Sequence, residues 1–183
     1  MIEAVEAVRE RALRATRALA AAGIPYAVTG GNAVAAWVAR VDRAAVRNTQ
    51  DVDILVQRTD LPAVREALEG AGFYYRELLG VTCFLDTPDS HPRDAIHLLF
   101  AGENVKPNDL APTASVEERV TAEDYEVVDL EPLVRMKLTS YRRKDQMHLL
   151  DMISVGLIDP SWTNKFPEPL ANRLQQLLDD PEG

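Results

Sequence analysis

The chain has few cysteines and histidines, and it has no long apolar run. Its one cysteine, Cys83, excludes an intrachain disulfide, and with three histidines it offers too few ligands for a structural zinc site. No stretch approaches the roughly 18 apolar residues of a membrane span. Early glutamates, Glu3 and Glu6, are unlike the start of a secretory signal. We therefore expect a soluble cytoplasmic protein with no membrane partner.

Positive charge is also scarce. The chain has 20 basic and 29 acidic residues, for a formal net charge of −9. The only lysines are Lys106, Lys137, Lys144 and Lys165. A broad, non-specific grip on nucleic acid needs many cationic contacts with phosphates, so the composition excludes that class of binding. The composition is still compatible with one small basic patch, which would be enough to bind an RNA end.

The 183 residues suffice for one domain with a substantial core. Short apolar runs alternate with segments of helical periodicity, which predicts an α/β (α+β) fold with a mixed sheet flanked by helices. The predicted helices are 2–22, 32–40, 60–71, 131–143, 145–155 and 168–179; the predicted strands are 26–29, 51–57, 73–78, 81–85, 93–100 and 125–129. We expect an α/β body over 1–130 and a helical C-terminal part over 131–183, packed on the same domain.

Two aspartates open the second predicted strand. Asp51 and Asp53 are two positions apart, so their side chains face the same way. Paired carboxylates repel each other unless a cation lies between them, and a hard divalent ion prefers oxygen ligands. The alternative is two surface acids at a loop–strand junction. Apolar residues on both faces of the strand favour the metal interpretation.

A glycine pair lies where the first strand turns into a helix. Gly30 and Gly31 allow unusual backbone angles and close approach of a ligand. The following helix offers unpaired N–H groups, and its dipole favours a phosphate. The glycines could also serve only to make a tight turn, a role compatible with phosphate binding. A phosphate cradle beside a carboxylate pair suits phosphoryl or nucleotidyl transfer.

These motifs resemble the polymerase-beta-like nucleotidyltransferase superfamily. The resemblance rests on Thr29-Gly30-Gly31 followed by Asp51-Val52-Asp53-Ile54. The form Arg-x-Thr-x-Asp-apolar-Asp over 47–53 is similar to the abortive-infection and toxin–antitoxin type. The later segments Arg142–Asp145 and His148–Asp151 also resemble that type, so the likeness extends over about 26–158.

The resemblance implies Mg²⁺, or Mn²⁺, held by Asp51, Asp53 and a third carboxylate on a later strand. Asp94 is our choice for this third ligand, with a further role as base toward the acceptor hydroxyl, and Asp86 is its competitor. Asp94 could instead be a surface charge. His97 fits a hydrogen-bonded core histidine better than a catalytic group.

The resemblance also implies a nucleotide-binding set of Gly30, Gly31, Arg47, Thr49 and Lys137. Arg47 could clamp phosphate or pair with Asp51, and Thr49 could contact phosphate or brace the loop. Lys137 could reach the triphosphate of ATP or another NTP, or lie on a solvated helix face.

The function implied is transfer of an NMP from an NTP to an acceptor hydroxyl, with release of pyrophosphate. The acceptor could be a small molecule, a protein side chain or an RNA end, and a protein partner of toxin–antitoxin type is possible. The alternative is a catalytically inactive nucleotidyltransferase-like module with a binding or regulatory role.

Overall fold

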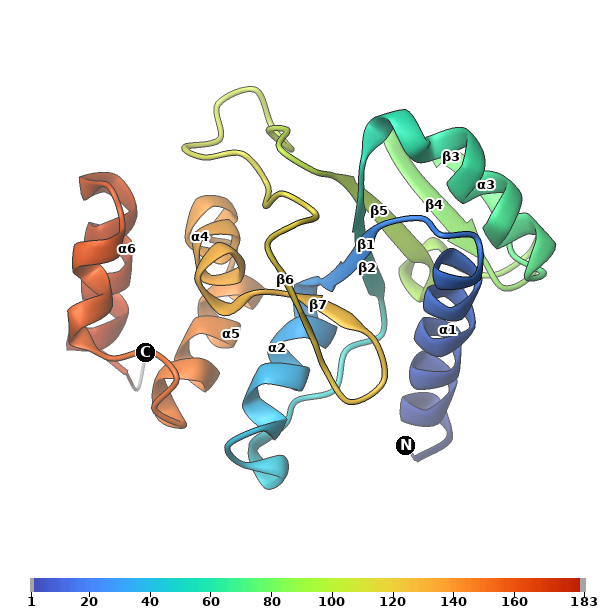
Figure 1. The fold of residues 1–183 in the computed structure, drawn as a ribbon. Coiled ribbons are helices and arrows are strands. Elements are labelled where there is room, and N and C mark those ends of the chain that lie inside the picture. The colour runs from blue at the N-terminus through green and yellow to red at the C-terminus, as the bar shows by residue number, and fades with distance from the viewer. Residues whose placement is uncertain (1, 182–183) are drawn as a thin grey trace.

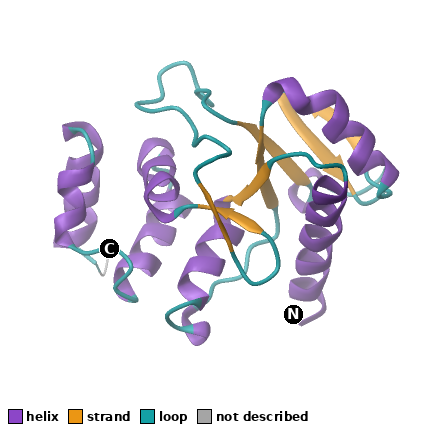
Figure 2. Ribbon diagram, in the orientation of Figure 1, coloured by secondary structure: helices purple, strands orange, loops and turns teal. Residues whose placement is uncertain are grey.

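The computed structural model describes residues 2–181 and contains one mixed β-sheet with helices packed around it (Figures 1 and 2). The elements are α1 (Ile2–Ala21), β1 (Tyr26–Thr29), α2 (Gly30–Ala39), β2 (Val52–Val56), α3 (Leu61–Gly70), β3 (Tyr74–Leu78), β4 (Val81–Leu85), β5 (Ile96–Phe100), β6 (Arg119–Thr121), β7 (Glu126–Val128), α4 (Leu130–Ser140), α5 (Arg143–Ser154) and α6 (Glu168–Asp179). The predicted mixed α/β architecture is confirmed.

The sheet runs in the order β3-β4-β5-β2-β1-β7-β6. β2 pairs with β1 in the antiparallel sense and with β5 in the parallel sense. Val52, Ile54, Leu55 and Val56 of β2 are fully buried, as expected for a central strand that is covered on both faces. The start of β2 therefore lies between two neighbours whose backbones are fixed by the sheet.

The helices form two groups. α1 and α3 pack against each other, on the right in Figure 1. α2 contacts α4 and α5, and α6 also contacts α4 and α5, on the left. Within residues 2–181, no helix combines the length and the apolar character needed to cross a bilayer.

Several elements differ from the predictions; α4, for example, ends at Ser140 and not at residue 143. α2 begins at Gly30 itself, two residues before the predicted start. β5 begins at Ile96 and not at residue 93, because Pro92–Asp94 form a 3₁₀ turn. The three-residue strand β6 was not predicted, since so short a run carries no readable alternation. The shifted start of β5 matters most, because it decides which residue lies opposite Asp53.

Candidate functional site

The turn from β1 into α2 lies against the side chains of Asp53 and Thr49. Gly30 has a φ of +64°, in the left-handed region that favours glycine, and a Cβ built there would lie 1.9 Å from Oδ2 of Asp53. A Cβ on Gly31 would lie 2.9 Å from the Thr49 side chain. Gly30 therefore lets the backbone lie against the Asp53 carboxylate, and Gly31 lets it lie against Thr49. The close approach of a ligand, which the sequence led us to expect, stays a prediction.

Asp51, Asp53 and His97 come together at the start of β2 and β5. Asp53 and His97 are register partners across these parallel strands. One ligand atom from each of the three side chains lies within 4.8 Å of the other two. All three side chains are half-buried, so a small ion could reach them from solvent. Two carboxylates and one imidazole form a donor set that fits a divalent cation.

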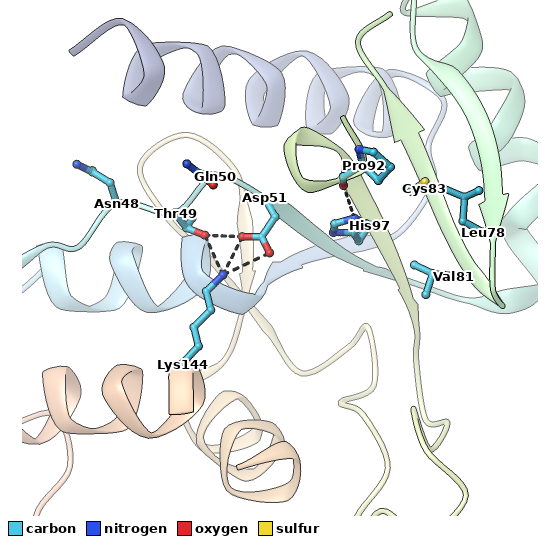
Figure 3. A pocket seen from close by; sticks show the side chains of 10 residues that line it. All are labelled: Asn48, Thr49, Gln50, Asp51, Leu78, Val81, Cys83, Pro92, His97 and Lys144. Atoms are coloured by element: carbon cyan, nitrogen blue, oxygen red, sulfur yellow. Dashed lines mark hydrogen bonds and ion pairs between the residues drawn. The ribbon is translucent and has the colours of Figure 1, made fainter. Parts of the chain in front are cut away.

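Asp51 is held from several directions. The Oγ1 of Thr49 donates to Oδ1 of Asp51 at 2.5 Å, and Nζ of Lys144 lies 3.0 Å from the same oxygen (Figure 3). Burial raises the pKa of Asp51, but the Thr49 hydroxyl and the Lys144 ammonium outweigh it and hold that pKa below its ordinary value. The backbone is also fixed, since Asn32 donates to the Asp51 carbonyl at 2.8 Å. Asp51 thus stays ionised.

His97 lies between a carbonyl and a carboxylate. Its Nε2 is 2.9 Å from the carbonyl oxygen of Pro92, and its Nδ1 is 3.7 Å from Oδ1 of Asp53. The Asp53 carboxylate raises the pKa of His97 above its ordinary value, against the opposing effect of burial. The histidine that sequence reasoning assigned to the core therefore faces the aspartate pair.

Neither acid expected as the third carboxylate belongs to this group. Asp94 is exposed in the 3₁₀ turn before β5. Asp86 is bound by Arg11 at 2.6 Å and by Arg14. Because the turn delays the start of β5, the position opposite Asp53 falls on His97, three residues after Asp94.

The expected phosphate-binding side chains have partners within the protein. Nε of Arg47 donates to Asp151 at 2.8 Å, and not to Asp51 as the alternative interpretation had it. Lys137 is buried, with Nζ 3.0 Å from Oδ1 of Asp145. It therefore does not lie on a solvated helix face. Lys144, which contacts Asp51, is not among the residues expected from the sequence, although it lies in the Arg142–Asp145 segment on which the resemblance partly rests.

A cavity of about 660 Å³ is lined in part by Asp51 and His97 (Figure 3). One part of its lining is polar, and the other part is apolar. The polar residues are Asn48, Thr49, Gln50, Asp51, His97 and Lys144; the others are Leu78, Val81, Cys83 and Pro92. Its volume falls in the range of small-molecule sites, roughly 300–1,000 Å³.

Solved structures share this fold at low sequence identity. An antigenic nucleotidyltransferase-like protein from Paracoccidioides brasiliensis has a TM-score of 0.65 and 17% identity, over 98% of this chain and 91% of that one. The antibiotic-resistance factor ANT(2'')-Ia has a TM-score of 0.54 and 14% identity, over 93% and 92%. JHP933 from Helicobacter pylori has a TM-score of 0.53 and 14% identity, over 97% and 76%.

A family model gives the more direct assignment. Among curated proteins, none matches the chain. Residues 3–130 match a family model described as "Uncharacterised nucleotidyltransferase", and this stretch holds the glycine turn, both aspartates and His97. On this match over more than half of its length, the chain belongs to that nucleotidyltransferase family.

Proposed function

We propose that this chain transfers an NMP from an NTP to an acceptor hydroxyl, with release of pyrophosphate, and that the reaction depends on a divalent metal ion. The observation that carries the proposal is the convergence of Asp51, Asp53 and His97 beside the glycine turn. Family membership supports the reaction class. The acceptor oxygen bonds to the α-phosphorus as the bond to the bridging oxygen breaks, and the acceptor's proton passes to water.

The residues of the site have separate tasks in this proposal. Asp51 and Asp53 would hold the ion, which supplies charge neutralisation for the phosphates. The backbone at Gly30 and Gly31 starts α2, and the side chain of Thr29 makes no capping hydrogen bond there. The N–H groups of this first turn are therefore suited to phosphate oxygens. The chain contributes mainly positioning and electrostatic stabilisation.

The lining of the cavity favours an acceptor that is neither a polyanion nor a polycation. Among the described residues that line it, Lys144 is the one lysine or arginine, and Asp51 is the one carboxylate. With a net charge of −9, the chain gains little from a long RNA footprint. A small molecule or a protein side chain therefore fits this surface better than an extended RNA.

The test is a transfer assay with each labelled NTP, Mg²⁺ or Mn²⁺, and one representative of each acceptor class. Asp51→Asn and Asp53→Asn should each lower transfer by at least about a hundredfold, the scale reported for lost electrostatic groups in active sites. Asp89→Asn removes the same charge from an exposed loop and is the matched control.

Binding separates this proposal from the inactive alternative. Calorimetry with a non-hydrolysable NTP should show metal-dependent binding that both site variants weaken. If the wild-type protein binds no NTP with any divalent ion, the transferase proposal fails and the non-catalytic module is favoured.

A further inference from the structure

The two ring nitrogens of His97 have different environments. Nε2 lies 2.9 Å from the Pro92 carbonyl oxygen, which can only accept a hydrogen bond, so Nε2 carries the hydrogen (Figure 3). In the neutral ring, Nδ1 is then the nitrogen with a free lone pair. That nitrogen is on the side of Asp53, 3.7 Å from Oδ1.

This arrangement is typical of a metal-binding histidine. Such a histidine donates its second ring N–H to a backbone carbonyl or a carboxylate, which fixes the tautomer and the orientation of the ring. Pro92 supplies that carbonyl from the 3₁₀ turn before β5. The hydrogen bond is made outside the group of three possible ligands, so it is an observation independent of their proximity.

We propose that Nδ1 of His97 is the third ligand beside Asp51 and Asp53, and that the site prefers a first-row transition-metal ion to Mg²⁺. Mg²⁺ strongly prefers oxygen ligands, whereas transition ions also accept imidazole, with affinities that generally rise from Mn²⁺ through Co²⁺. The inference rests on the proposed function, because the ion is the one that nucleotidyl transfer would use. It differs from the Mg²⁺ expectation drawn from the family resemblance.

The sheet holds this donor set in place before an ion arrives. Asp53 and His97 are paired in register on adjacent parallel strands, and Val52 and Ile54 beside Asp53 are fully buried. The backbone therefore has little freedom to exchange His97 for Asp94, which lies in the preceding turn. Preorganised ligands of this kind select an ion by ligand chemistry as well as by charge.

The test measures ion binding directly, by calorimetry with Mg²⁺, Mn²⁺ and Co²⁺ in turn. The wild-type protein should bind Co²⁺ and Mn²⁺ at least about tenfold more tightly than Mg²⁺. His97→Gln should lose most of that preference. His97→Asp, which replaces the imidazole with an oxygen ligand, should shift the preference toward Mg²⁺. Circular dichroism and thermal unfolding show that each variant folds.

A spectroscopic readout identifies the ligand itself. Pulsed electron paramagnetic resonance of bound Mn²⁺ should show nitrogen coupling from a directly bound imidazole, and His97→Gln should abolish it. Asp94→Asn should retain both the coupling and the affinity. Equal affinity for Mg²⁺ and Mn²⁺, absence of nitrogen coupling, or loss of binding in Asp94→Asn would overturn the inference.

The two proposals fail in different ways. Transfer of NMP with Mg²⁺ and without nitrogen coupling would leave the proposed function standing and remove His97 from the ligand set. Nitrogen coupling without NTP binding would support the His97 assignment and contradict the proposed function.

Discussion

At the scale of single residues, Gly30 determines how closely the chain can approach Asp53. Two separate effects oppose any larger residue there, a φ of +64° and a contact of 1.9 Å between a new Cβ and Oδ2 of Asp53. The left-handed backbone alone costs a non-glycine residue about 1–2 kcal/mol. The contact also displaces the Asp53 carboxylate, because the Cβ that overlaps with it is attached directly to the backbone.

Gly30→Ala should therefore lose both stability and metal binding, with ion affinity lowered by at least about tenfold. Gly23→Ala is the matched control, since Gly23 has a φ of +68° and no atom within 4 Å of a new Cβ. Gly23→Ala should lose only the stability that corresponds to its left-handed backbone conformation. Urea unfolding and calorimetry of both variants measure the difference. Equal ion affinity in the two variants would contradict a close approach of the turn to the site.

Lys144 acts as the counter-ion of Asp51 in the described structure. Its Nζ lies 3.0 Å from Oδ1 and 3.3 Å from Oδ2, and about half of its side chain is exposed. An ammonium so placed competes with any metal ion for the same oxygens. Lys144→Met should therefore raise metal affinity in the absence of nucleotide by several-fold. Lys106→Met, on an exposed loop, removes the same charge and should leave it unchanged. Weaker metal binding in Lys144→Met would refute the competition.

At the scale of elements, the junction of α4 and α5 is built around buried charge. Asp145 is fully buried and accepts from Lys137 at 3.0 Å, Ser140 at 2.6 Å and Arg142 at 2.8 Å. Burial acts to raise its pKa, but these donors and charges hold the pKa of Asp145 well below its ordinary range. The proposed contact of Lys137 with phosphate stays a prediction. In the structure, the Lys137 side chain of α4 pairs with Asp145 of α5.

His148 of α5 gives this junction a pH dependence. Burial, followed by the charges of Lys137 and Lys144, lowers the pKa of His148 to about 4, although Asp145 and Asp51 oppose them. The unfolded chain binds the proton at a pKa of about 6.5, so the unfolded state gains protons first as pH falls. The contribution of His148 to the free energy of unfolding is therefore fully present above about pH 6.5 and is lost toward pH 4, by up to about 3 kcal/mol. Urea unfolding from pH 7.5 to pH 4.5 should show this decline in the wild-type protein. The decline in stability should be much shallower in His148→Leu. An unchanged slope in this variant would show that His148 does not cause the decline.

At the scale of the whole molecule, the α/β body and the C-terminal helices share contacts through α2, which packs on both α4 and α5. We propose that 1–130 and 131–183 unfold together. Trp37 reports on the body, where its Nε1 donates to the Val128 carbonyl at 3.0 Å, and Trp162 reports on the segment before α6. Each of the variants Trp162→Phe and Trp37→Phe keeps one tryptophan, and in each the fluorescence midpoint in urea should equal that variant's own midpoint by circular dichroism. Separate midpoints would divide the chain near residue 130.

The sequence indicated the fold class, the glycine turn and the aspartate pair, because each depends on residues close together in the chain. It did not indicate His97, because strand register is decided by tertiary packing, and a 3₁₀ turn moved the start of β5 past Asp94. Lys144 was missed for a similar reason, since it reaches Asp51 from 93 residues away. Local pattern thus predicted two of the three possible metal ligands, and long-range pairing supplied the third.

The family match ends at residue 130, yet the cavity takes part of its lining from α5. The matched region holds the groups proposed for chemistry, and the last fifty residues contribute Lys144, which lines the cavity and contacts Asp51. Under the proposed function, a substitution at Lys144 would change the wall of the cavity without touching the glycine turn or the strand that carries Asp53.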